Sequence, residues 1–343
     1  MGKKKKRTIL AILAAAFLAV FIGAICFGRH SVPLRQTLRL LVNHVSTGLF
    51  RAPLAKTWTD SMKSMVINVR LPRVIAAAAI GAGLSVSGAT YQGIFKNPLV
   101  SPDLLGVSAG ATVGASAAIL LGLSSSLIQL CALVGGICAV LITVSIPRMF
   151  NNSSSTMLVL AGIVVSGFMS ALQGLAKYVA DPESQLASIV FWTMGSLASV
   201  MMKTVLPVLP AMAVALFLIL GIRWRINLLS LGTAEAQSLG VNITLVRGLA
   251  VVCSTILTAC SVCISGTIGW VGLVIPHFSR LLIGEDNRYM IPAAMLLGAS
   301  FMVVVDTLAR TLTSGEIPLS IITGLLGTPI FIILLKRQKS RIS

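Results

Sequence analysis

Long uncharged, apolar stretches alternate with short polar ones along the whole chain. The stretches without Asp, Glu, Lys or Arg are residues 8–28, 74–95, 104–147, 149–176, 184–202, 204–222, 248–279, 289–305 and 317–335. A membrane-spanning helix needs about 20 consecutive apolar residues, whereas a membrane β-strand alternates over about 10. No such alternation occurs, and lipid leaves an open backbone without hydrogen-bond partners. The pattern therefore predicts an all-α polytopic membrane protein.

The longest stretches predict more than one helix each. Residues 104–147 are long enough for two spans joined by a turn at "LGLSSS". Residues 248–279 predict one full span, a turn at "SGTIGWVG" and a short helix containing Pro276. Residues 184–202 are broken by Gly195, so we interpret them as a helix on the membrane surface. About ten transmembrane helices result.

The same pattern divides the chain into tails, a first span, an outer loop and a core. Both tails are basic, "KKKKR" and "KRQKSR", so both are expected in the cytoplasm. The first apolar stretch exceeds a signal-peptide core and no A-x-A site follows it, which favours an uncleaved span. The predicted bounds are 1–7 for the first tail, 8–28 for the first span, 29–62 for the extracytoplasmic loop, 63–337 for the core and 338–343 for the second tail.

Composition agrees with a membrane protein. Of the 343 residues, 56% are hydrophobic and 10% are charged, against about 25% charged in soluble domains. The net charge of +18 is interpreted as basic loops, without nucleic acid as a partner. The outer face is unusually basic, with Asp60 as the one acid among eight cations, which favours an acidic soluble partner. These cations are Arg29, Arg35, Arg39, Arg51, Lys56, Lys63, Arg70 and Arg73.

The motifs of catalysis and of nucleotide or metal binding are absent. The chain has no G-x-x-x-x-G-K-[ST] loop, so we expect it to hold no ATP itself. All six cysteines lie in apolar stretches, which favours packed thiols over a metal site. No paired carboxylates and no Ser/His/Asp set stand out. We therefore expect neither an enzyme active site nor a cofactor bound directly.

Asp306 is the one acid inside a predicted span, and Arg310 lies four residues further on. On a helix the two side chains share a face. An ionisable group inside a membrane is a functional candidate, and a structural ion pair near the outer surface is the alternative. An ion-gradient-driven secondary transporter would use such a group, so that function stays open.

A short internal echo suggests a repeat. "VSG" ending at Gly88 precedes Pro98 by ten residues, and "ISG" ending at Gly266 precedes Pro276 by the same distance. The predicted topology gives the two segments opposite orientations, which is typical of inverted-topology repeats in transporters. Gly81, Ser85 and Gly88 also recur at helical spacing, and small residues let helices pack closely.

Several long motifs resemble the FecCD family, the permease subunits of ABC importers for iron–siderophore, haem and cobalamin. They are "RLPRVIAAAAIGAGLSVSGATYQGIFKNPLVSPDLLGVSAGA" at 70–111, "SLGTAEAQSLGV" at 230–241, "SGTIGWVGLVIPHFSRLLIG" at 265–284, "DTLAR" at 306–310 and "EIPLSIITGLLGTPIFIILL" at 316–335. The motifs occur in the family's order, and the resemblance covers about residues 60–337.

The resemblance implies a type II ABC importer in the bacterial inner membrane. Two permease subunits, as a homodimer or heterodimer, form the path. Two separate cytoplasmic ATPases hydrolyse the ATP, and an extracytoplasmic binding protein delivers the ligand. An iron–siderophore is the expected ligand, with haem and cobalamin as alternatives.

The resemblance also implies roles for three groups of residues. The inner gate would comprise Asn97, Leu99, Ser154, Ser155 and Thr156, although Ser and Thr are also common helix caps. The cytoplasmic coupling loop, 223–243, would contact the ATPase through Leu231, Gly232, Glu235, Ala236, Leu239 and Gly240. The binding protein would dock on Arg70, Arg73 and Arg310.

Overall fold

The computed structural model describes residues 2–28, 32–50, 58–150, 154–231, 236, 238–240, 242–313 and 315–339. Within these residues all the regular structure is helical, which confirms the predicted fold class. The α-helices are α1 (Lys3–Cys26), α2 (Leu34–Phe50), α3 (Asp60–Lys63), α4 (Leu71–Phe95), α5 (Val107–Leu120), α6 (Ser125–Met149), α7 (Ser155–Val179), α8 (Gln185–Met194), α9 (Met202–Val205), α10 (Leu209–Leu231), α12 (Ile243–Ser265), α13 (Val271–Ile283), α14 (Asn287–Thr311) and α15 (Leu319–Lys339). A π-helix, η1 (Ser64–Arg70), joins α3 to α4, and a 3-10 helix, η2 (Pro102–Leu105), precedes α5.

Seven helices in the described residues are long and apolar enough to cross a membrane. They are α1, the continuous helix Asp60–Phe95 that includes α4, and α6, α7, α10, α12 and α14. The other three segments predicted to span coincide with α5, α13 and α15, whose apolar parts are shorter. A helix rises about 1.5 Å per residue and the hydrocarbon core is about 30 Å thick. The number of complete crossings therefore stays a prediction.

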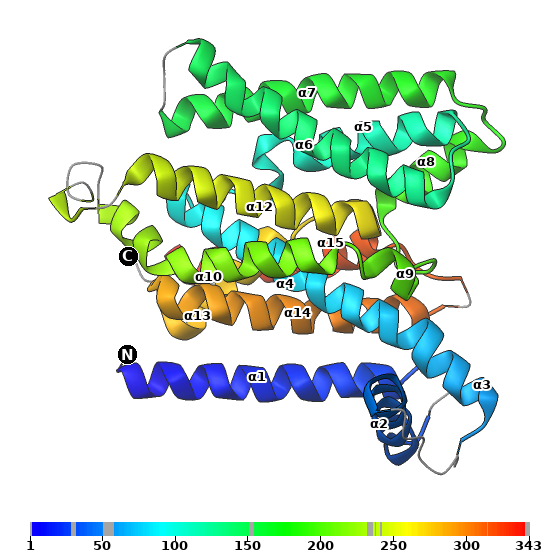
Figure 1. The fold of residues 1–343 in the computed structure, drawn as a ribbon. Helices are drawn as coiled ribbons and strands as arrows, with labels where there is room; N and C mark the ends of the chain where they lie inside the picture. The colour runs from blue at the N-terminus through cyan, green and yellow to red at the C-terminus, as the bar shows by residue number, and fades with distance from the viewer. Residues whose placement is uncertain are drawn as a thin grey trace.

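Helix α4 occupies the middle of the bundle (Figure 1). Helices α10, α12, α13 and α14 surround it, α1 lies along one edge, and α5, α6 and α7 form a group along the opposite edge. Of the 18 most apolar consecutive residues of Asp60–Phe95, 83% are buried, whereas only 17% are buried in the corresponding part of α1. The chain begins and ends at the same end of the bundle (Figure 1). We call this the N-terminal end and the other the α2 end.

Small residues bring α4 close to its neighbours. A Cβ at Gly81 would overlap the carbonyl oxygen of Gly298 in α14, and a Cβ at Gly88 would overlap that of Gly272 in α13. Ser85 lies between them on the same face and contacts Gly298. The close packing predicted from the spacing of these residues is confirmed. It allows α4 to be buried on nearly every side.

The two similar sequence segments, 86–98 and 264–276, do not occupy equivalent positions in the structure. Gly88 lies inside α4, whereas Gly266 ends α12 with a φ of +72°. Pro98 lies in a turn, whereas Pro276 lies inside α13. A long helix followed by a break and a short helix nevertheless occurs twice, in α4–α5 and in α12–α13. The repeat therefore concerns elements rather than the quoted residues.

Two segments outside the long spans are also helical. Residues 185–194 form α8, which ends before Gly195 (φ +75°), as the sequence predicts for the 184–202 segment. Residues 34–50, placed in the predicted 29–62 loop, form α2. Helix α2 has fewer residues than a span needs, so a search for long apolar stretches does not find it.

Candidate functional site

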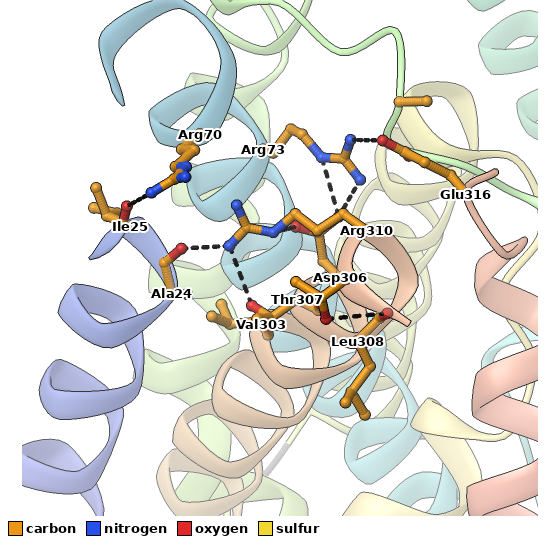
Figure 2. Close-up of polar contacts among 12 residues, drawn as sticks. Ala24, Ile25, Arg70, Arg73, Val303, Asp306, Thr307, Leu308, Arg310 and Glu316 are labelled. Carbon is orange, nitrogen blue, oxygen red and sulfur yellow. Dashed lines mark hydrogen bonds and ion pairs between the residues drawn. The ribbon is translucent and has the colours of Figure 1, made fainter. Parts of the chain in front are cut away.

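A cluster of charged side chains is buried at the α2 end of the bundle (Figure 2). Arg73 of α4 contacts Asp306 of α14 at 2.8 Å between Nη2 and Oδ1, and its Nε donates to the same oxygen at 3.2 Å. Its Nη1 lies 2.7 Å from Oε1 of Glu316, in the connection between α14 and α15. Arg310 lies one turn after Asp306, 3.7 Å from its Oδ2. Arginine suits this position because its planar fork can reach two carboxylates at once.

The same cluster holds the C-terminal end of α1. Arg70 donates through Nη1 to the carbonyl oxygens of Ile25 and Cys26, both at 2.8 Å, and Arg310 donates to that of Ala24. The last carbonyls of a helix have no partner inside the helix and carry partial negative charge. The last turn of α1 contains no basic residue of its own. The arginines of η1 and α14 therefore supply the cations that this helix end lacks.

The three predicted docking arginines come together, but they are buried. Arg70 and Arg73 are 3% exposed and Arg310 is 8% exposed. Their guanidinium groups contact α1, Asp306 and Glu316, as described above. A partner's carboxylate could reach Arg73 only by displacing one of these contacts. The docking role of these arginines stays a prediction.

The predicted pair of Asp306 and Arg310 is present, but Arg73 is the closer partner of Asp306. Arg73 precedes Asp306 by 233 residues, so sequence spacing could not join them. Glu316 was also missed, because it lies outside the helices. Asp306 is fully buried between two arginines. Removing one partner of a buried pair leaves the other charge uncompensated, so the cluster fixes α4, α14 and α1 relative to one another.

The turn after α4, predicted as part of a gate, lies at the N-terminal end of the bundle. Lys96 ends α4 with a φ of +52°, and Asn97 Oδ1 accepts from the Leu99 backbone N–H at 2.9 Å. The Leu99 side chain is 58% exposed. An exposed leucine on an ordered turn can contact another chain or line the translocation path. Its gating role stays a prediction.

Gln92 and Arg280 hold this turn in place. Arg280 of α13 donates to Gln92 Oε1 at 2.6 Å, and Gln92 Nε2 donates to the carbonyl oxygen of Val100 at 3.1 Å. The turn is thereby connected to α13 as well as to α4. Neither residue was singled out in the sequence. The Arg280 guanidinium would have been a signal, because Arg280 lies one turn after Pro276 and is the one Lys, Arg, Asp or Glu residue in α13.

Asp103 is a second acid that sequence reasoning missed. It lies in η2, between the turn and α5, and accepts a hydrogen bond from the Ser108 hydroxyl. Burial raises the pKa of this carboxyl, and the hydrogen bond from Ser108 opposes the rise. The N-cap of α5, Gly106, has a φ of +81° and no side chain that could cap the helix. The hydrogen bond between Asp103 and Ser108 instead connects η2 to the first turn of α5.

The second predicted constriction lies at the start of α7. Ser154 is the N-cap of this helix, and its hydroxyl accepts from the Met157 backbone N–H at 3.2 Å. Ser154 and Thr156 are exposed, and the Ser155 side chain lies outside the described part of the structure. This contact fits the alternative to a gating role that the sequence left open, in which the serine caps a helix. A gating role for this cluster stays a prediction.

The predicted coupling loop, 223–243, is helical in its first part, because α10 continues to Leu231. Its remaining residues connect α10 to α12 at the N-terminal end of the bundle (Figure 1). Ala236 is buried, Leu239 is 58% exposed and Gly240 has a φ of +76°. Asn242 caps α12 by accepting from the Leu245 backbone N–H at 3.0 Å. Gly232, Glu235 and the Leu231 side chain lie outside the described residues.

Within the predicted 223–243 segment, the end of α10 is hydrogen-bonded to the start of α14. Asn227 Nδ2 donates to Asp286 Oδ1 at 2.7 Å, and Asn227 Oδ1 accepts from the Asn287 backbone N–H at 2.8 Å. Asp286 also accepts from the Arg288 guanidinium, with Nη2 2.8 Å from Oδ2. These bonds lower the pKa of Asp286 to about 2, with Arg288 as the largest cause. A movement of the loop would therefore reach α14 through Asn227.

The chain is similar to known transport proteins over nearly its whole length. The sequence profile of the FecCD transport family matches residues 12–337. A molybdate import system permease protein of Haemophilus influenzae is 42% identical over 81% of this chain and 82% of its own length. A protein of Helicobacter pylori, named a probable iron chelatin transport system permease protein, is 39% identical over 97% of this chain and 99% of its own.

A solved structure has the same fold. It is an ABC transporter of the metal-chelate type in an inward-facing conformation, and it is 36% identical to this chain. The match covers 96% of this chain and 99% of the other, with a TM-score of 0.85. The order and packing of the helices described above are therefore shared with a transporter.

Proposed function

The chain belongs to the FecCD transport family, and we propose that it imports a metal chelate, driven by a separate ATPase and supplied by an extracytoplasmic binding protein. Family membership makes it a permease of an ABC transporter, not an enzyme. The observation that carries the proposal is the match over residues 12–337, which includes both the predicted gate and the coupling loop. An iron–siderophore is the proposed ligand, with haem and cobalamin as alternatives.

Coupling would run through residues 223–243. The exposed Leu239 beside Gly240 offers an apolar contact at the end of the bundle that we assign to the cytoplasm. Both termini are proposed to lie on that side of a bacterial inner membrane, because "KKKKR" and "KRQKSR" are basic. The bonds from Asn227 to Asp286 and Asn287 support a path from this loop into α14.

A second permease subunit is proposed to pack against α7. Gly167, Ser170, Ala171 and Gly174 recur at helical spacing on its exposed side. A Cβ at Gly167 or Gly174 would meet no atom within 4 Å. Small residues let membrane helices approach closely, so this side of α7 suits a helix of another subunit. The path and the gate residues Leu99 and Ser154 would then face that subunit.

We also propose that the binding protein docks on Arg70, Arg73 and Arg310, provided that it displaces contacts that these arginines already make. These arginines are bonded to α1, Asp306 and Glu316. Glu316 is the most accessible of these partners, with its side chain 28% exposed. Docking on Arg73 would therefore have to displace Glu316 first.

The test is ATP-driven uptake in proteoliposomes that contain this chain, its partner ATPase and its binding protein. Glu235→Arg, or deletion of 232–239, should abolish uptake while the chain still inserts into the membrane. Glu183→Arg, an exposed acid in the connection between α7 and α8, is the matched control and should leave uptake unchanged. Normal ATP-driven uptake by the deletion variant would contradict the coupling role.

The same vesicles separate the alternatives. Uptake without ATP that follows a proton or sodium gradient would support a secondary transporter instead. The ligand is tested by offering a ferric siderophore, haem, cobalamin and molybdate to the loaded binding protein. The last is included because one relative is named a molybdate import permease. Uptake of molybdate alone would contradict the proposed chelate.

A further inference from the structure

Helix α2 has an exposed apolar stripe. Leu34, Leu38 and Val42 are 54%, 41% and 56% exposed. They follow one another at intervals of four residues, so they line one side of the helix. In Figure 1 α2 is seen nearly end-on beside the end of α1, which runs across the view. The axis of α2 therefore lies across the direction in which α1 spans.

The opposite side of α2 packs on the protein. Thr37 is 0% exposed and Leu40 is 1% exposed. Leu40 belongs to the same hydrophobic core as Ile25, near the end of α1, and Val66, in η1. The packed side fixes the rotation of α2 about its axis. The stripe of leucines and valine must consequently face away from the bundle.

Two arginines border the stripe. Arg35 follows Leu34 and Arg39 follows Leu38, and both arginines are exposed. One residue turns an α-helix by about 100°, so both lie along the same border of the stripe. Helices that lie in the membrane–water interface combine an apolar face with Arg or Lys beside it. Arginine can bind a phosphate through two parallel hydrogen bonds.

The position of α2 along the bundle fits the membrane surface. Helix α1 is long and apolar enough to span, and it ends at Cys26, eight residues before α2 begins. Arg70 holds that end from η1. Helix α2 thus lies where hydrocarbon gives way to headgroups. From this geometry we propose that α2 is an interfacial helix whose stripe enters the bilayer and whose arginines bind anionic phospholipid headgroups.

Lipid fits the stripe better than a soluble partner does. The exposed side of α1 is also apolar, with Ile12 61% and Leu18 57% exposed, and Phe27 just beyond its end is 68% exposed. The stripe on α2 continues this apolar surface around the end of α1. Both helices lie at the edge of the bundle opposite α5, α6 and α7 (Figure 1). The proposal does not depend on which ligand is transported.

The test places a fluorophore on the stripe of the full chain in lipid nanodiscs. Leu38→Cys is labelled with bimane in a chain whose six native cysteines are replaced. The discs contain phosphatidylcholine with phosphatidylglycerol, and the acyl chains of one lipid at a time are brominated so that they quench nearby fluorophores. Glu183→Cys is the control position, because this residue is exposed in the connection between α7 and α8, which lies at the α2 end in Figure 1. Val42→Cys is the second reporter, for use if the first variant does not fold.

Quenching should be several-fold stronger at residue 38 than at residue 183, and stronger with brominated phosphatidylglycerol than with brominated phosphatidylcholine. Arg35→Glu with Arg39→Glu should remove that preference, by about fivefold for each arginine, since each cation near an anionic surface contributes about 1 kcal/mol. Lys203→Glu, which is exposed on α9, should leave the preference unchanged. Arg35→Gln should reduce it in part and replaces the double variant if that does not fold.

Three results would overturn the proposal. Equal quenching at residues 38 and 183 would mean that the stripe lies in water. Equal quenching by the two brominated lipids would remove the role of anionic headgroups. Protection of residue 38 from aqueous iodide only after the binding protein is added would make α2 a protein-docking surface instead.

Discussion

The charged cluster at the α2 end shows what single residues do in this protein. Its arginines, Arg70, Arg73 and Arg310, outnumber its carboxylates, Asp306 and Glu316, by one. The end of α1 supplies part of the remaining negative charge, because a helix C-terminus carries about half an elementary charge. The spacing of Asp306 and Arg310 predicted one contact. The others depend on α1, α4 and α14 meeting in space, which sequence spacing cannot express.

Removing the buried acid should destabilise the protein more than removing its exposed neighbour. Asp306→Asn leaves Arg73 and Arg310 facing a neutral group, and breaking a buried pair typically costs about 3–5 kcal/mol. Glu316→Gln changes a partly exposed contact and should cost about 1 kcal/mol or less. The measurement is the thermal unfolding midpoint of the purified protein in mild detergent. A larger loss for Glu316→Gln would contradict the central place given to Asp306.

Asp286 predicts an acid-dependent loss of stability at the N-terminal end. Its pKa in the folded protein is about 2, below the ordinary 3.8. A depressed carboxyl pKa stabilises the fold above the ordinary value, and this contribution is lost as the pH falls from about 4 to about 2. Asp286→Asn should therefore lower the unfolding midpoint at neutral pH, and the difference from the unsubstituted protein should shrink as the pH falls to about 2. A midpoint difference between the two proteins that is constant over this range would contradict the prediction.

At the scale of helices, the length of apolar stretches and the spacing of small residues predicted the long helices and their packing. The short helices could not be predicted in this way. The long stretches predicted the apolar helices from α1 to α15, seven of which are long enough to span, and Gly81, Ser85 and Gly88 predicted the close packing of α4. Helix α2 was missed because its apolar residues alternate with polar ones over less than a span. The lengths of α5 and α13 were also unpredictable, since breaks inside an apolar stretch depend on packing around glycines such as Gly106 and Gly266.

Adding one methyl group at the contact of α4 and α14 should destabilise the protein. The Cβ of Gly81→Ala would overlap the backbone of Gly298, and backbone cannot move aside easily. Overpacking of this kind costs about 1–3 kcal/mol. Gly248→Ala in α12 is the matched control, because its Cβ would meet no atom within 4 Å. Thermal midpoints should fall for the first and rise slightly for the second, as alanine is about 0.5–1 kcal/mol better in a helix. A rise for both would contradict the contact.

At the scale of the whole molecule, the two edges of the bundle differ. The edge formed by α1 is apolar with a basic helix at its end, whereas α7 exposes small residues on one side. The family motifs predicted the permease function, and the comparisons agree with it. Partner surfaces were less predictable. The docking arginines followed from the family resemblance, and their burial depends on how α1, α4 and α14 meet in space.

Cross-linking should identify the side of α7 that meets a second subunit. Ala171→Cys, in a chain without its native cysteines, should form dimers with a short cross-linker in proteoliposomes, because Gly167 and Gly174 beside it leave room for another helix. Phe217→Cys on α10 is the control, since this side chain is 75% exposed and is expected to face lipid. Equal cross-linking at both positions would argue for random encounters rather than a defined interface.

The contact between Arg73 and Asp306 also has a consequence for the order in which the protein is made. Asp306 follows Arg73 by 233 residues. A ribosome adding about 5–20 residues per second reaches the aspartate roughly 10 to 50 seconds after the arginine. During that interval α4 is present with its guanidinium uncompensated, and α1 lacks the cation of Arg310. The core helix therefore takes its final place only after α14 has been synthesised. A nascent chain interrupted before that point carries Arg73 without the Asp306 carboxylate that it contacts in the folded protein.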